Sequence, residues 1–225
     1  IGAAVIDDVL GLLALAIGVW ALLMLPLLPW GLPSTADDDL LFGGEPPWPA
    51  ARYNAAADLA QLAAREAGAD TDLNPLRARD RLVDLTADDQ ARAEILRRYR
   101  LYSRQPDEMI IFRALQRMRP RQLDFDPRLY QYGGGYIYLV GGGLGLAALL
   151  HYVPLSGDIS RYLEHPELFA RCYVVARLLS LVFGALTLWA VFKLARPAGG
   201  RRAAWLAVAV VACLPVFITA VLEAK

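Results

Sequence analysis

The sequence is poor in cysteine, histidine and lysine, and its charges balance. Cys172 and Cys213 both lie in or beside apolar runs, which predicts small buried side chains rather than a disulfide or a metal pair. His151 and His165 are far apart and lack the carboxylate–histidine spacing of a metal site. The formal net charge of +0 removes the bulk attraction that nonspecific nucleic-acid binding requires. No Gly-x-x-x-x-Gly-Lys motif is present to cradle a nucleotide phosphate.

What the sequence does contain is long apolar runs. It is 56% hydrophobic with a mean hydropathy of +0.35, and the charged residues, 20% of the total, are concentrated between the runs. Apolar stretches at residues 9–30, 170–195 and 203–222 match in length the hydrocarbon core of a bilayer, about 30 Å thick. We therefore predict an all-α polytopic membrane protein. Asp7 and Asp8 stand where a secretory signal would be basic, so we interpret the first run as a transmembrane helix.

The charge distribution predicts how these helices cross the membrane. Residues 193–202 form a short turn whose basic residues are Lys193, Arg196, Arg201 and Arg202. The positive-inside rule places such a turn in the cytoplasm. The stretch 134–153 is also apolar, but counting it as a full span would move the basic turn to the outer side. We therefore predict an interfacial or re-entrant helix there; the alternative is four spans with the N-terminus outside.

The predicted organisation follows from this topology. It comprises a first transmembrane helix in residues 1–30, an extracytoplasmic subdomain with helices near 55–67 and 88–104 in residues 31–133, a juxtamembrane or re-entrant segment in residues 134–168, and two transmembrane helices joined by a cytoplasmic turn in residues 169–225. The sequence begins with Ile1 and its last apolar run stops abruptly at Lys225. We expect it to be the N-terminal portion of a longer protein.

A pair of acids opens a further predicted helix in the outer segment. Asp107 and Glu108 follow Pro106, and apolar residues recur from there at helical spacing to about Met118. Proline suits the first position of a helix, and the free N–H groups of the first turn stabilise ionised carboxylates. Ordinary helix-start chemistry explains an isolated pair of this kind equally well, so its meaning depends on the segments that follow.

These segments occur in a characteristic order. They are Met118-Arg-Pro-Arg-Gln-Leu-Asp-Phe-Asp-Pro127, the tyrosine-rich 128–138, Ala176-Arg177-Leu-Leu-Ser-Leu-Val-Phe-Gly184, the basic turn, and Leu214-Pro215. Together with the first span, the order resembles membrane glycosyltransferases of the GT-C fold. In particular it resembles the dolichyl-phosphate-mannose protein mannosyltransferase family (glycosyltransferase family 39) and its aminoarabinose transferase relatives. Two departures stand out: Gly133 and Gly134 replace the family's prolines, and a long insertion separates the first span from Asp107.

The resemblance implies a hexosyl- or pentosyltransferase at the extracytoplasmic face of the plasma (inner) membrane. Such an enzyme moves a sugar from a polyprenyl-phosphate donor to a protein, lipid or glycan acceptor by a single inverting displacement. This reaction needs one base, which the resemblance assigns to Asp107, with Glu108 orienting the acceptor or helping a bound cation. The acidic cluster Asp37, Asp38 and Asp39, just after the first span, is the alternative site.

Further roles follow from the same chemistry. The forked guanidinium of arginine suits a leaving phosphate, and the candidates are Arg113, Arg171 and Arg177. Snorkelling to the membrane interface is the alternative for Arg171 and Arg177. The candidates for the sugar or acceptor pocket are Tyr130, Gln131 and Tyr132, which also suit an interfacial aromatic belt. We expect no required cofactor and no nucleic-acid partner, and we leave participation of a divalent cation open.

Two other interpretations remain, a transporter fragment and a non-catalytic membrane subunit. A transporter predicts ionisable residues at mid-membrane, which residues 9–30 and 203–222 lack. A subunit predicts no acidic pocket at the membrane surface. The glycine groups at 133–135 and 141–145 lie in an apolar context, which favours close helix packing over nucleotide binding.

Overall fold

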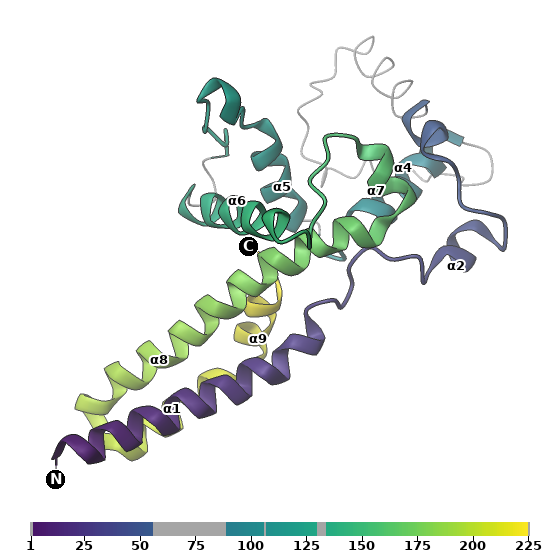
Figure 1. The fold of residues 1–225 in the computed structure, drawn as a ribbon. Helices are drawn as coiled ribbons and strands as arrows, with labels where there is room; N and C mark the ends of the chain where they lie inside the picture. The colour runs from purple at the N-terminus through teal and green to yellow at the C-terminus, as the bar shows by residue number, and fades with distance from the viewer. Residues whose placement is uncertain (1, 56–88, 106, 130–133, 225) are drawn as a thin grey trace. The chain divides into compact units, whose positions relative to one another are not determined.

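The computed structural model describes residues 2–55, 89–105, 107–129 and 134–224, and within these ranges the chain is helical and contains no strand. In chain order the elements are α1 (Gly2–Met24), the 3-10 helix η1 (Leu25–Leu27), α2 (Asp38–Phe42), α4 (Asp89–Leu101), α5 (Glu108–Arg117), the 3-10 helix η2 (Pro120–Gln122), α6 (Gly134–Leu149), α7 (Ile159–Glu164), α8 (Pro166–Cys213) and α9 (Pro215–Leu222) (Figure 1). The helical class predicted from the sequence is confirmed for these residues. The helix predicted near 55–67 lies outside them.

The chain divides into two compact units. Unit 1 comprises Ile1–Trp30, Ile111–Ala147 and Tyr173–Lys225, and unit 2 comprises Gly31–Ile110 and Ala148–Cys172. The first contains nearly all of the apolar runs, and the second contains most of the charged block. The two units therefore differ in mean hydropathy along the chain.

Unit 1 is built on a helical hairpin. The two limbs of α8 meet at Gly200, whose φ of 75° and ψ of −176° are not helical and favour glycine. Phe192 on the first limb and Trp205 on the second are in edge-to-face contact, with 5.2 Å between their ring centroids. Leu13 of α1 is buried in the same apolar cluster, so α1 packs against the hairpin (Figure 1).

The helices of unit 1 differ from the predicted spans at two prolines. The run 203–222 is interrupted at Leu214, which is extended at φ −67° and ψ 123°, and the chain resumes as α9. Pro215 causes this break because its ring disfavours the α conformation in the preceding residue. Helix α1 ends at Met24, before the predicted end of the first span at residue 30, and Pro26 lies in the 3-10 turn that follows.

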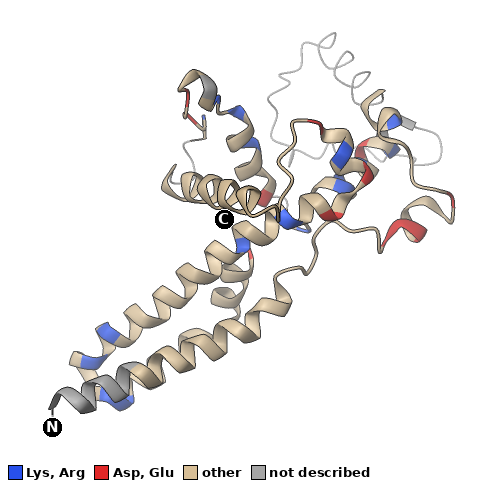
Figure 2. Cartoon of the chain, in the orientation of Figure 1, with Lys and Arg blue, Asp and Glu red and all other residues tan. Residues whose placement is uncertain are grey.

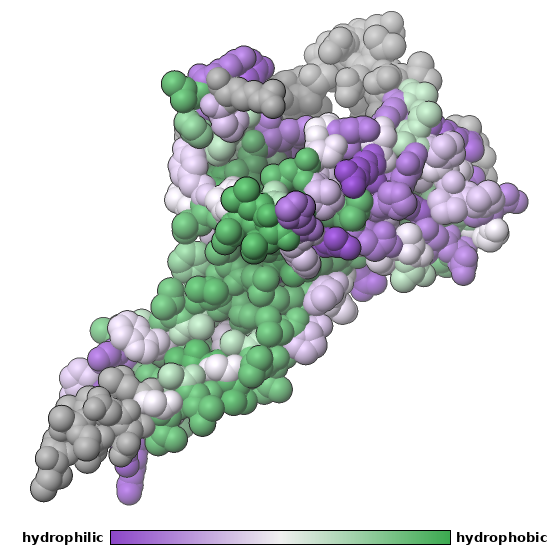
Figure 3. Space-filling view, in the orientation of Figure 1, coloured by the Kyte–Doolittle hydropathy of each residue, from purple (hydrophilic) through white to green (hydrophobic). Residues whose placement is uncertain are grey.

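One helix among the described residues, α8, is long and apolar enough to cross a membrane, while the apolar stretches Gly11–Leu27 and Gly134–Leu149 are shorter. The outward faces of unit 1 are nonetheless apolar. Leu15 and Leu22 of α1 are 65% exposed, and Leu186 of α8 is 54% exposed. Figure 3 shows this hydrophobic surface running along the helices. Apolar surface of this extent indicates an apolar partner.

Helix α6 has one packed face and one exposed face. Ile137, Val140, Leu144 and Ala147 are buried, whereas Tyr138, Leu139, Leu146 and Leu149 are exposed. A Cβ on Gly141 would lie 2.9 Å from Leu115 of α5, and one on Gly143 would lie 3.2 Å from Leu179 of α8. At these two glycines, the close helix packing predicted from the sequence is confirmed.

Gly184 is the tightest point between α8 and its neighbours, which yields a stability prediction. A Cβ there would lie 2.6 Å from Val221 of α9 and 3.2 Å from Trp20 of α1. We expect Gly184→Leu to destabilise the purified protein by about 2 kcal/mol through overpacking, measured by thermal unfolding in detergent. Gly18→Leu is the matched control, because no atom lies within 4 Å of a Cβ at Gly18. Equal melting temperatures for the two variants would contradict the packing.

Unit 2 has its own apolar core and a buried ion pair. Helices α4 and α7 contribute Leu96 and Leu163 to a cluster that also buries Trp48 and Tyr53. Arg100, near the end of α4, contacts Asp38 of α2 at 2.6 Å and donates to the carbonyl oxygen of Leu163 at 3.1 Å. The unit is thus held together by apolar packing and by one arginine that joins three elements.

The helix predicted near residues 88–104 is confirmed, because α4 spans Asp89–Leu101.

Candidate functional site

The acid pair of the sequence lies where α5 begins. Chain geometry there depends on Ser103, whose hydroxyl is within hydrogen-bonding distance of the Gln105 carbonyl oxygen, at 2.8 Å, and of the Glu108 carboxylate. The Gln105 N–H donates back to the Ser103 hydroxyl at 3.2 Å. The Glu108 N–H donates to the Gln105 carbonyl at 3.2 Å. These bonds form a compact turn that fixes the first residues of α5.

The two carboxylates of the pair occupy different environments. Glu108 is fully buried, at 0% exposure, against the buried Ser103 hydroxyl. Asp107 is half-buried, and among the described residues no hydrogen bond or ion pair reaches its side chain. A buried carboxylate held by a hydroxyl keeps one geometry, whereas a carboxylate open to solvent can accept a proton from an incoming group. The structure therefore separates a fixed acid from an accessible one.

The alternative acidic cluster is arranged differently. Asp38 is paired with Arg100, and these side chains are 14% and 3% exposed. Burial raises the pKa of Asp38 above its usual value, and it outweighs the opposing attraction of the Arg100 guanidinium. Asp37 and Asp39 flank it with exposed side chains. The central acid of the cluster thus joins α2 to α4, and this pairing occupies the carboxylate that a base would need.

Two of the three candidate phosphate-binding arginines bind backbone carbonyls. Arg177 is 3% exposed and donates to the carbonyl oxygens of Leu28 at 2.7 Å and Trp30 at 2.8 Å. These carbonyls lie just beyond η1, where a helix end leaves acceptors unpaired. Arg171 is exposed and donates to the Tyr152 carbonyl at 3.2 Å. Arg113 lies half-buried on α5, in the same helix as Glu108.

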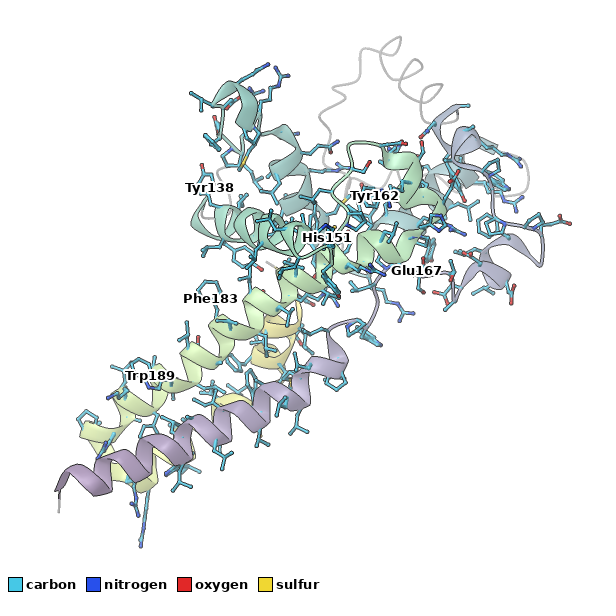
Figure 4. All side chains as sticks on the ribbon, viewed as in Figure 1. Tyr138, His151, Tyr162, Glu167, Phe183 and Trp189 are labelled. Atoms are coloured by element: carbon cyan, nitrogen blue, oxygen red, sulfur yellow. The ribbon has the colours of Figure 1, made fainter. Side chains whose placement is uncertain are left out.

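Unit 2 also contains a polar groove that the sequence analysis did not identify. Its volume is roughly 780 Å³, and it is lined by Asp158, Ser160, Arg161, Glu164, His165, Glu167, Leu168 and Arg171. Figure 4 marks Glu167, at the start of α8. Although burial opposes it, hydrogen bonding by Thr35 holds the pKa of Glu167 below its usual value, and the Thr35 N–H donates to this carboxylate at 3.0 Å. The density of charged residues between 158 and 171 was the available signal in the sequence.

The predicted pocket residues Tyr130, Gln131 and Tyr132 lie outside the described residues. Within the described part of the chain, no group of three or more histidine, cysteine, aspartate or glutamate side chains is arranged to hold a metal ion. No family model, no curated protein and no solved structure matches this chain in the comparisons with known proteins.

Proposed function

We propose that this chain is part of a membrane glycosyltransferase. It would transfer a sugar from a polyprenyl phosphate to a hydroxyl-bearing protein, lipid or glycan at the outer face of the plasma membrane. The order of sequence motifs supports the family, and the two acids at the start of α5 support the chemistry. The observation that carries the proposal is their division into a buried, hydrogen-bonded Glu108 and an accessible Asp107.

The topology that the proposal requires agrees with the α8 hairpin. The limb from Pro166 to the kink at Gly200 rises by about 50 Å at 1.5 Å per residue, more than the ~30 Å hydrocarbon core. With the basic turn in the cytoplasm, the first turns of α8 extend beyond the outer leaflet. A multi-pass chain with α1 and the two limbs of α8 in the bilayer then presents the polar residues 31–110 to the outside.

In the proposed reaction Asp107 acts as the base. Its carboxylate takes the proton of the acceptor hydroxyl while the hydroxyl oxygen attacks C1 of the sugar. The bond from C1 to the phosphate oxygen breaks, and the polyprenyl phosphate leaves with the bonding electrons. Glu108, which is fully buried, holds the turn that carries Asp107. Because one displacement occurs, the anomeric configuration is inverted.

The direct test is a transfer assay in membranes from cells that express the protein. Polyprenyl-phosphate mannose, glucose and arabinose, each labelled in the sugar, are supplied in turn. We expect one donor to lose its label to an acceptor fraction in these membranes and not in membranes lacking the protein. NMR of the product should show an anomeric configuration opposite to that of the donor.

Two outcomes would contradict the proposed transferase activity and indicate a different function. A donor that crosses the bilayer without losing its sugar would indicate a lipid transporter. If all three donors stay intact and are not moved, while the protein co-purifies with an active transferase, it would be a non-catalytic subunit. Retention of the donor configuration in the product would contradict the single displacement.

The Ser103 hydroxyl yields a prediction for the same assay. Ser103→Ala removes the hydroxyl that contacts Glu108 and accepts from the Gln105 N–H. We expect kcat to fall about tenfold, since one such hydrogen bond contributes roughly 1.5 kcal/mol, with little change in the KM for the donor. Ser103→Thr, which keeps the hydroxyl, should retain most of the rate. Equal rates for the two variants would show that the hydroxyl does not position the acids.

A further inference from the structure

The turn of the α8 hairpin carries four basic residues within ten positions. Lys193, Arg201 and Arg202 are exposed and Arg196 is half-buried. Among the described residues, none of them forms an ion pair. Figure 2 shows basic positions, in blue, at the end of the hairpin. Four basic side chains so close together make a local positive potential that attracts anionic groups.

The geometry of the turn is held by packing. Gly200 adopts a backbone conformation that favours glycine, and this residue makes the turn. The ring contact between Phe192 and Trp205 joins the two limbs just before and after it. Phe192 is fully buried, and Ala204 beside it is also at 0% exposure. The basic side chains therefore project from a fixed scaffold rather than from a loose loop, which reduces the entropy lost when they bind a ligand.

An apolar surface continues directly from these basic residues. Leu194 is 76% exposed and Leu206 is 66% exposed. Trp189, 46% exposed and labelled in Figure 4, lies one turn before Lys193, whose ammonium is 5.5 Å from its ring centroid. Tryptophan with a neighbouring lysine is typical of the boundary between acyl chains and headgroups. A phospholipid presents a phosphate and acyl chains together, which matches both the charges of the turn and the exposed leucines beside them.

We propose that this hairpin turn is a binding site for anionic phospholipids. The guanidinium groups of Arg196, Arg201 and Arg202 bind headgroup phosphates, and the Lys193 ammonium binds a further phosphate beside Trp189. Forked guanidinium groups suit phosphate oxygens, and each base near an anionic lipid surface strengthens binding by roughly fivefold. The acyl chains of the bound lipids cover Leu194 and Leu206. The proposal does not depend on glycosyl transfer, because no donor or acceptor takes part.

Lipids with brominated acyl chains test the site, because bromine quenches the tryptophans next to the turn. The purified full chain is reconstituted in phosphatidylcholine containing a small fraction of brominated phosphatidylglycerol or brominated phosphatidylcholine. We expect the anionic probe to be preferred at least fivefold, with the preference falling as salt rises. The variant K193Q/R196Q/R201Q/R202Q should lose it, and R196K/R201K/R202K, which keeps the charge, should retain most of it.

Three results would overturn the proposal. The first is equal quenching of the wild-type protein by the two brominated lipids. The second is an anionic preference that survives in the glutamine variant, which would place the lipid elsewhere on the chain. The third is tight binding of a soluble acidic peptide or polyphosphate without discrimination between lipids, which would identify a soluble partner. Circular dichroism of the reconstituted glutamine variant shows whether the helices are intact.

Discussion

Asp107→Asn is expected to reduce sugar transfer about 10³-fold, within the range that a positioned general base contributes to a rate. Asparagine keeps the size and polarity of the side chain at the start of α5 but cannot take the proton of the acceptor hydroxyl. Since the Asp107 side chain is half-buried and has no partner among the described residues, folding should be unaffected. Membrane insertion and melting temperature should therefore match the wild type while the labelled donor stays intact.

The matched control for this experiment is Asp39→Asn. Asp39 is exposed in the first turn of α2 and belongs to the alternative acidic cluster. We expect its rate to stay within about twofold of the wild type, as for a surface substitution away from the chemistry. If Asp107→Asn transferred sugar at the wild-type rate and an Asp37–Asp39 variant did not, the base would have to be assigned to that cluster.

The second large effect is expected on stability. Arg100→Met leaves Asp38 buried without its guanidinium partner and removes the bond to the Leu163 carbonyl. Breaking one side of a buried ion pair costs about 3 kcal/mol. Urea unfolding of the detergent-solubilised protein, followed by circular dichroism, should show this loss. Arg98→Met is the control, because Arg98 is exposed on the same helix.

A double variant distinguishes the loss of the ion pair from the change in side-chain size at residue 100. Asp38 Oδ1 and Arg100 Nε are buried without a hydrogen-bond partner among the described residues, so the pair is imperfectly satisfied. Replacing both partners by apolar residues, Arg100→Met with Asp38→Leu, should recover most of the stability lost in the single variant. Additive losses would contradict the assignment of Arg100 as the partner of Asp38.

The pH dependence of the single variant has a defined sign. Burial raises the pKa of Asp38 in the folded protein, and without Arg100 the opposing attraction is gone. The folded state then binds more protons than the unfolded state over the range between the two pKa values, so its stability falls as pH rises through that range. Arg100→Met should therefore be less damaging in mildly acidic buffer than at neutral pH. An unchanged deficit on acidification would show that Asp38 titrates normally there.

The helices follow closely from the sequence, with exceptions that have local causes. Helices α4 and α5 begin and end near the predicted positions, because their apolar spacing and capping residues are local signals. The break at Leu214 was missed because an apolar run masks the effect of the proline that follows it. The continuation of α8 back to Pro166 was also missed, since its first turns are polar and do not resemble a membrane span.

The candidate site was predictable only in part. Asp107 and Glu108 stand out in the sequence, because acids after a proline mark a helix start, but their different environments depend on contacts with Ser103 and on burial. The pairing of Asp38 with Arg100 joins residues far apart in the chain, and no local pattern indicates it. The same holds for Arg177, whose carbonyl partners belong to the first apolar segment.

Composition and periodicity were thus sufficient for the helical class, the basic turn and the position of the acid pair, because each depends on neighbours a few residues away. Which carboxylate is accessible, which is paired, and which arginine caps a helix end were decided by the tertiary structure. Burial and ion pairing arise from segments brought together by folding, and the free energies of these contacts do not depend on their separation along the chain.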